Sequence, residues 1–195
     1  YSNHIYEHPR VKTVIEDGRT YVHRSTDKFD LIENASIGTN ALVVPSTSVL
    51  TFQDAYLWTV EANRDYFRHL TDDGVAVTII YGLLDEYNAI DPQRGITYHA
   101  LRQYSNVKQA LEQEGLDPEK HLVIMRYLRA PENAQAAAAQ AEYTFLFKRA
   151  LQPQDVNELI DAGRRFNLEP LFAPYLDDSL DFEELSRSIP PDRSV

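Results

Sequence analysis

The sequence predicts an α/β fold with a mostly parallel sheet and an antiparallel strand at its carboxyl-terminal edge. Strand-like and helix-like patterns alternate over the first part of the chain, as parallel strands joined by crossover helices require. Residues 75–80 form a nearly continuous apolar, β-branched run, which is typical of a strand covered on both faces. Two strand-like runs at residues 121–128 and 142–149 follow one another, which favours an antiparallel pair.

Five elements are predicted in the first part of the chain. In order they are a strand at residues 11–15, a short helix from 18 to about 25, a strand at 29–32, a loop at 34–48 and a helix at 53–70. Pro9 biases the preceding residue toward extended backbone, so a strand begins just after it. Gly18 permits the tight turn into the short helix. The loop exceeds the roughly 12 residues common in compact domains, which favours a functional lid or a disordered segment.

The helix at residues 53–70 is predicted from its apolar spacing. Tyr56, Val60, Phe67 and Leu70 recur at helical intervals. Asp54 lies in the first turn, where the helix dipole favours a negative charge.

The second part of the chain continues this alternation. In order we predict the strand at 75–80, a loop at 82–95, a helix at 96–114, strands at 121–128 and 142–149, a helix from 153 to about 166 and a short strand at 171–173. Gly115 ends the first of these helices, and Pro153 occupies the favoured first turn of the second. One short helix explains the alanine-rich stretch at 133–141. No linker divides the chain, so residues 1–195 are treated as one domain.

Composition excludes several classes of protein. A formal net charge of -11 argues against a nucleic acid partner, because phosphate recognition needs clustered Lys and Arg. A cationic or neutral small substrate fits better, although such a charge more often reflects solubility than the ligand. The chain has no cysteine, which excludes disulfides, thiolate nucleophiles and cysteine-ligated metals. Only His4 and His8 have the four-residue spacing of a zinc helix, and they precede Pro9 in a non-periodic segment, so no metal is expected. The apolar run at 75–81 is far shorter than the ~20 residues of a membrane span.

An ordered set of short segments resembles the spermidine synthase family. The run HPRV at residues 8–11 is similar to the DPRV strand of that family, and the acidic-glycine turn and the FDLI strand follow in the same order. The similar segments are residues 8–11, 17–19, 28–32, 56–62, 68–70 and 73–75. This set of segments resembles large bacterial spermidine synthase-like proteins, many of which carry membrane segments outside this domain.

The resemblance implies a Rossmann-type fold of the S-adenosylmethionine-dependent methyltransferase superfamily, here missing its first strands. The glycine-rich turn and the acidic residue that binds the ribose hydroxyls precede the matched segments in that family, so we expect them upstream of Tyr1. The implied cofactor is S-adenosylmethionine or its decarboxylated form, as substrate of the complete domain and without a metal. We expect a cytoplasmic chain whose parent protein is attached to a membrane, if at all, through segments outside it.

Three cofactor-binding residues are expected from this resemblance. Asp17 matches the acid that contacts adenine, because a carboxylate at the end of a strand can accept a hydrogen bond from the adenine amino group. Gly18 lies beside it, and Asn34 begins the loop on the same side of the sheet. The alternative is that Asp17 and Gly18 only form a turn.

Three further residues are candidates for substrate binding, because the helix after the long loop lies near the active face in the related enzymes. They are Asp54, Tyr56 and Glu61. The alternative is a capped amphipathic helix with Tyr56 in the core.

The expected catalytic position departs from the family pattern. Aminopropyltransferases end this strand with a D-x-S-D-P-like segment whose aspartate helps to deprotonate the attacking amine. Residues 33–38 read ENASIG and hold no aspartate, and Glu33 is only a possible substitute. The catalytic residue is therefore left unassigned, and aminopropyl transfer by the isolated chain is not expected.

Two functional hypotheses follow. The chain is the carboxyl-terminal part of an S-adenosylmethionine-type transferase that binds a small-molecule substrate. Alternatively, it is a non-catalytic binding or scaffold module that forms a homodimer through sheet edges left exposed by the missing strands.

Overall fold

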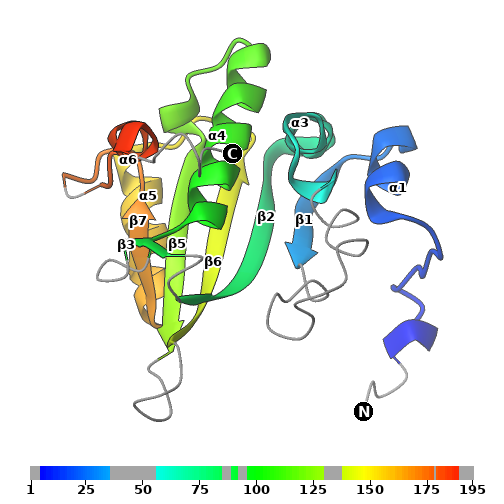
Figure 1. Ribbon diagram of the computed structural model, residues 1–195. Helices are drawn as coiled ribbons and strands as arrows, with labels where there is room; N and C mark the ends of the chain where they lie inside the picture. Colours follow the sequence, from blue (N-terminus) through cyan, green and yellow to red (C-terminus); the bar gives the residue numbers. More distant parts are fainter. Residues whose placement is uncertain are drawn as a thin grey trace.

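The computed structural model describes residues 5–35, 56–84, 89–91, 96–129, 138–177 and 179–188 (Figure 1). In chain order its elements are η1 (Ile5–Glu7), α1 (Gly18–Arg24), β1 (Phe29–Ala35), η2 (Tyr56–Trp58), α3 (Val60–Arg68), β2 (Leu70–Leu84), β3 (Ala89–Asp91), β4 (Ile96–Thr97), α4 (Tyr98–Gln113), η3 (Pro118–Lys120), β5 (Leu122–Arg129), β6 (Ala138–Phe147), α5 (Pro153–Arg164), β7 (Leu168–Phe172) and α6 (Phe182–Ser188). The predicted α/β class is confirmed.

Five of these strands form one sheet in the order β1-β2-β6-β5-β7, and β3 and β4 form a separate pair. β1 and β2 are parallel, whereas each of the other three neighbouring pairs is antiparallel. The antiparallel strand at the carboxyl-terminal edge, β7, is confirmed. The expectation that most pairs are parallel is wrong for the described strands. β6 inserts between β2 and β5, which run in the same direction, and so replaces one parallel contact with two antiparallel ones.

The join between β1 and β2 depends on a glycine. Phe29 pairs with Leu70 and Leu31 with Val75, so β2 contains extra residues at this point. A Cβ atom at Gly74 would lie 2.8 Å from the carbonyl oxygen of Phe29, closer than real Cβ contacts. Glycine therefore lets the two backbones approach where β2 begins to follow β1.

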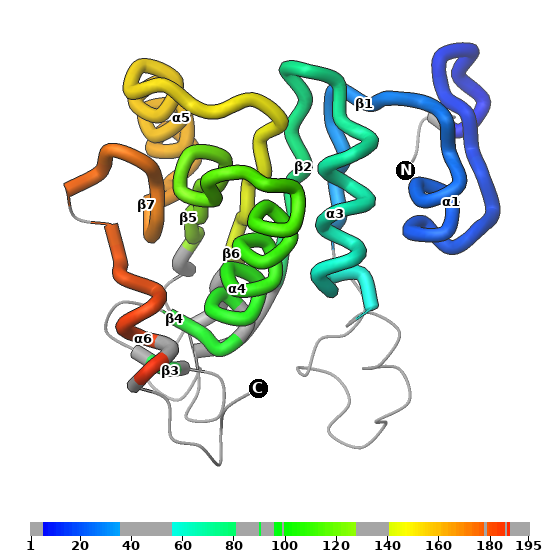
Figure 2. The backbone as a smooth tube through the Cα atoms, turned by 90° about the horizontal axis from the view of Figure 1, so that it is seen from above, coloured from blue at the N-terminus to red at the C-terminus, as the bar shows by residue number. Residues whose placement is uncertain are grey.

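The main core lies between the sheet and the helices α3 and α4. Alternate residues of β5 point to opposite faces, so Leu122 and Ile124 pack into this core while Val123 and Met125 pack beneath α5. Figure 2 shows α4 and α5 on opposite sides of the sheet. Members of the main core that α3 and α4 supply are Ala62, Tyr66, Phe67, Ala100, Leu101, Tyr104, Val107 and Leu111.

Helix ends follow the chemistry that the sequence indicated. Thr97 caps α4, its side chain accepting a hydrogen bond from the amide of Ala100. Gly115 follows that helix with a φ of 73°, a left-handed conformation that favours glycine. α5 begins at Pro153, where Gln152 and Asp155 form a reciprocal capping box. The predicted helices at 96–114 and 153–166 are confirmed, apart from small shifts at their ends.

The predicted strand at residues 11–15 is wrong, because this segment has no regular structure. Its apolar side chains are exposed, and Ile15 is fully so. A strand needs a neighbouring strand to satisfy its backbone groups, and among the described residues no strand pairs with this segment. A correct local pattern therefore did not produce a strand.

Two helix predictions also need correction. Within the described residues, the predicted helix at 53–70 is shorter than expected. Residues 56–58 form η2, α3 covers only Val60–Arg68, and Leu70 already belongs to β2. Ala138–Ala141, predicted as helix, form the first part of β6 because β2 pairs with all four residues and β5 pairs with residues 139–141 from the other side. Sheet pairing thus overrides the helix propensity of alanine. Residues 36–55 and 130–137 lie outside the described part of the chain, as does most of the predicted loop at 34–48.

Candidate functional site

Asp17 lies at the start of α1 and accepts two hydrogen bonds on one oxygen. Its Oδ1 accepts from the backbone amide of Thr20 at 2.8 Å, which caps the helix. The same atom accepts from the hydroxyl of Tyr56 at 2.5 Å. The acid predicted to bind the cofactor therefore contacts a residue predicted to bind the substrate, 39 positions further along the chain.

Arg19 holds Tyr56 from two directions. Its Nη1 donates to the carbonyl oxygen of Tyr56 at 3.0 Å, and its guanidinium carbon lies 4.6 Å from the centre of the Tyr56 ring. Its Nε lies 3.7 Å from a carboxylate oxygen of Asp65 on α3. α1, η2 and α3 are thus joined through one arginine, and Figures 1 and 2 both show α1 beside α3.

Asp65 is a second point of attachment for α1. Its side chain is largely buried, and its Oδ2 lies 3.1 Å from Nδ1 of His23, whose own side chain is mostly exposed. The backbone of Asp65 also takes part, since its carbonyl oxygen lies 2.7 Å from Nδ1 of His69. Nε2 of His69 lies 3.0 Å from the carbonyl oxygen of Ser25, just after α1. Polar contacts therefore help to attach α1, which has no fully buried residue, while its partly buried Val22 packs against the main core.

The charges at Asp17 follow from these contacts. The hydrogen bond from Tyr56 lowers the pKa of Asp17, and the amide of Thr20 lowers it further. Burial raises the pKa of Tyr56, and so does its hydrogen bond to Asp17. Asp17 is therefore an ionised acceptor at neutral pH, suited to a ligand group that donates a hydrogen bond.

The other predicted site residues are more scattered. Gly18 is the first residue of α1 and nothing crowds it, so a side chain would fit there. Glu61 lies exposed in the first turn of α3, where hydrogen bonds to its own backbone amide and to Thr59 lower its pKa. Asp54 lies outside the described residues. Tyr56 is half-buried rather than a core residue, because it belongs to η2 and not to α3.

Asn34 carries an unsatisfied polar group. It lies near the carboxyl end of β1, opposite Thr78 of β2. Its Nδ2 atom is buried and has no hydrogen-bond partner among the described residues. A buried amide donor needs a hydrogen-bond acceptor, and the described residues do not supply one.

Glu33 is a poor substitute for the missing catalytic aspartate. It is exposed, and strand alternation puts it on the opposite face of β1 from Ile32, which packs toward the main core, and from Asn34. Residues 36–38, the rest of the segment that differs from the family pattern, lie outside the described part of the chain. Glu33 therefore does not accompany Asn34 on its face of β1.

Sequence reasoning missed Arg19 and Asp65 as members of the site. In the sequence, Arg19 falls only within the segment at residues 17–19 that is similar to the spermidine synthases, and no role is predicted for this residue. Asp65 interrupts the buried face of α3 between Ala62 and Tyr66, and a charged residue at a core position is a signal that a partner is required. That partner could not be read from the sequence, because it lies on another helix.

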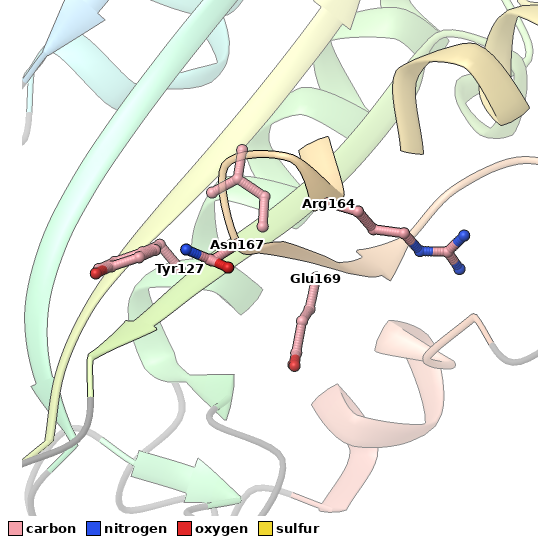
Figure 3. Close-up of a pocket in the computed structure, with 5 residues that line it drawn as sticks. Tyr127, Arg164, Asn167 and Glu169 are labelled. Carbon is pink, nitrogen blue, oxygen red and sulfur yellow. The ribbon is translucent and has the colours of Figure 1, made fainter. Parts of the chain in front are cut away.

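Two surface cavities lie elsewhere. One, of about 450 Å³, is lined by Tyr127, Arg164, Asn167, Leu168 and Glu169 near β7, at the other end of the sheet from β1. Figure 3 shows the guanidinium of Arg164 pointing away from Tyr127 and Asn167. The other, of about 390 Å³, lies between α4 and α6. None of the predicted site residues lines either cavity.

The chain is similar in structure to spermidine synthases. Two solved examples are the spermidine synthase of Thermotoga maritima and a spermidine synthase in complex with the transition-state analogue AdoDATO, with TM-scores of 0.41 and 0.42. Each is 18% identical to this chain, and the alignments cover 87% of this chain and 44% of the other. The chain thus spans less than half the length of the structures that it matches. No family model and no curated protein matches it.

The described residues lack two further kinds of feature. No group of three or more His, Asp or Glu side chains is placed to hold a metal ion in this part of the chain. No described helix is both long enough and apolar enough to cross a membrane.

Proposed function

We propose that this chain is the carboxyl-terminal part of a spermidine synthase-like, S-adenosylmethionine-type transferase, and that as an isolated chain it lacks aminopropyltransferase activity. The observation that carries the proposal is the contact between Asp17 and Tyr56. The sequence resemblance assigned these residues to the cofactor and to the substrate separately, and they meet at one carboxylate.

The described residues fit a nucleoside ligand in two respects. Asp17 supplies an ionised acceptor for an exocyclic amino group, and Asn34 supplies a buried donor without a partner among the described residues. When bound, a sulfonium nucleoside of this class supplies an activated alkyl group for transfer. Asp17, Gly18 and Asn34 are the residues that we propose to bind it, and Tyr56 and Glu61, with Asp54, are the residues proposed for the substrate.

The absence of the family's catalytic aspartate supports the proposed lack of aminopropyltransferase activity. A general base must lie within hydrogen-bond reach of the attacking amine. Glu33 is exposed on the other face of β1 from Asn34. We therefore expect ligand binding without polyamine synthesis.

Calorimetric titration tests this function directly. The chain, and any longer gene product that contains it, is titrated with S-adenosylmethionine, its decarboxylated form and methylthioadenosine. We expect measurable binding that Asp17→Asn weakens, since an amide cannot replace both acceptor oxygens. Asp161→Asn, a change on the exposed surface of α5, is the matched control. No heat with any of the three nucleosides would contradict the proposal.

A second function, a non-catalytic binding module that forms a homodimer, is favoured by the edge at β1. In the described sheet, β1 pairs with a strand on one side only. Leu31 on this strand is 55% exposed, and Ile15 in the nearby part of the sequence is fully exposed. Open strand edges with exposed apolar side chains favour association with another chain.

Light scattering at several micromolar concentrations separates the two functions. The module predicts a dimer that dissociates on dilution and is weakened by Leu31→Lys, whereas Phe166→Lys, at an exposed residue after α5, leaves it intact. A monodisperse monomer throughout would exclude the homodimer.

A further inference from the structure

We propose that Arg19 is a positioning residue, which fixes the ring of Tyr56 and through it the carboxylate of Asp17. The network runs from Asp65 to Arg19, from Arg19 to Tyr56 and from Tyr56 to Asp17. Its role toward a ligand rests on the proposed function, whereas its effect on Asp17 does not.

The network begins at a rigid anchor. Asp65 belongs to α3, and its neighbours Ala62 and Tyr66 are buried in the main core. Its carboxylate is largely buried and lies 3.7 Å from Nε of Arg19, whose side chain is also largely buried. A cation held in this way has less freedom than an arginine on an open surface.

Arg19 then contacts Tyr56 at two separate points. The hydrogen bond to the carbonyl oxygen holds the backbone of η2, and the guanidinium lies over the aromatic ring. A planar guanidinium can do both at once, which the ammonium of lysine does not do equally well. The ring of Tyr56 is therefore held in position as well as its backbone.

Tyr56 finally orients Asp17. Capping of α1 needs only the hydrogen bond from Thr20, yet Oδ1 of Asp17 also accepts from the Tyr56 hydroxyl at 2.5 Å. The Thr20 amide of α1 and the Tyr56 hydroxyl of η2 thus bind the same oxygen of Asp17. The network therefore fixes the orientation of this carboxylate.

The first measurement is the pKa of the Asp17 carboxyl group, followed by NMR in variants that keep the fold by circular dichroism. We expect Tyr56→Phe to raise this pKa toward the ordinary value of about 3.9, and Arg19→Leu to raise it by a smaller amount. Arg19→Lys is expected to fall between Arg19→Leu and the unchanged protein. Arg24→Leu is the control, because Arg24 lies on the same helix and pairs with Glu16 instead. An unchanged pKa in Tyr56→Phe and Arg19→Leu overturns the proposal.

The second measurement is the affinity for methylthioadenosine. We expect Tyr56→Phe to weaken binding about tenfold, because Asp17 is then no longer held in one orientation before the ligand binds, and Arg24→Leu to leave it unchanged. Binding that is as tight in Tyr56→Phe and Arg19→Leu as in Arg24→Leu overturns the role toward a ligand. If the unchanged protein binds no nucleoside while the pKa of Asp17 moves as expected, the proposed function fails and the network stands.

Discussion

The two ends of the sheet are held together by different forces. In the five-stranded sheet, β2, β6 and β5 each have a neighbouring strand on both sides. The main core beneath α4 contains completely buried residues such as Val107, Leu122 and Ile124. At the other end, α1 buries no residue, and ion pairs and hydrogen bonds attach it to α3. Leu31 on β1 and Ile15 before α1 are exposed.

The difference separates an apolar half of the molecule from a more polar one. Burial of apolar surface stabilises the half that contains α4 and α5. The amino-terminal end depends on side-chain hydrogen bonds, whose net contribution is smaller and whose geometry is more specific. The residues that we propose to bind a ligand lie in this second half.

Paired isoleucine substitutions test this comparison with the largest expected effect. Ile124→Ala should lower the free energy of unfolding by about 2–5 kcal/mol, because it leaves a cavity in the core. Ile15→Ala should change it by no more than about 0.5 kcal/mol, since Ile15 is fully exposed. Urea unfolding of both variants measures the difference. A comparable loss in Ile15→Ala would mean that the segment at 11–15 is buried in solution and would remove the contrast between the two ends of the sheet.

The same contrast explains which elements could be predicted from the sequence. The strands at 75–80 and 121–128 have neighbours on both sides, so local pattern and tertiary structure agree. The segment at 11–15 has an equally good pattern but no strand beside it among the described residues. Ala138–Ala141 fail for the opposite reason, because two neighbouring strands impose a conformation that alanine does not prefer.

The candidate site could be predicted only in part, for a similar reason. Asp17 and Tyr56 were found because each belongs to a segment similar to the spermidine synthases. Their contact, and the parts played by Arg19 and Asp65, depend on how α1 packs against η2 and α3. Contacts between residues about 40 positions apart leave no periodic pattern in the sequence.

A pair of glycine substitutions sharpens the comparison where the two halves meet. Gly74→Ala should cost about 1–3 kcal/mol, since its Cβ would lie 2.8 Å from the carbonyl oxygen of Phe29 and would force β1 away from β2. Gly18→Ala should be neutral or stabilising by about 0.4–1 kcal/mol, because nothing lies near it and its φ is not left-handed. Urea unfolding measures the cost, and amide exchange locates it. Loss of protection should be greatest in β1, and uniform loss over β5 and β6 would contradict the proposed junction.

The smallest expected effect is a pH dependence confined to the half that contains α5. Hydrogen bonds from Arg149 lower the pKa of Asp155 to about 2, and the amide of Gln152 at the start of α5 contributes further. In the unfolded chain this pKa is about 3.9, so the pair stabilises the fold at higher pH and the contribution disappears as pH falls from about 4 through about 2. Asp155→Asn should remove this part of the acid destabilisation, measured as the change in urea midpoint between pH 5 and pH 2.

The control is Asp161→Asn, which removes a carboxylate that pairs with Arg164 on the same helix. This variant should keep the acid sensitivity of the unchanged protein. Equal acid sensitivity in Asp155→Asn and Asp161→Asn would show that the capping box does not set the acid stability of α5.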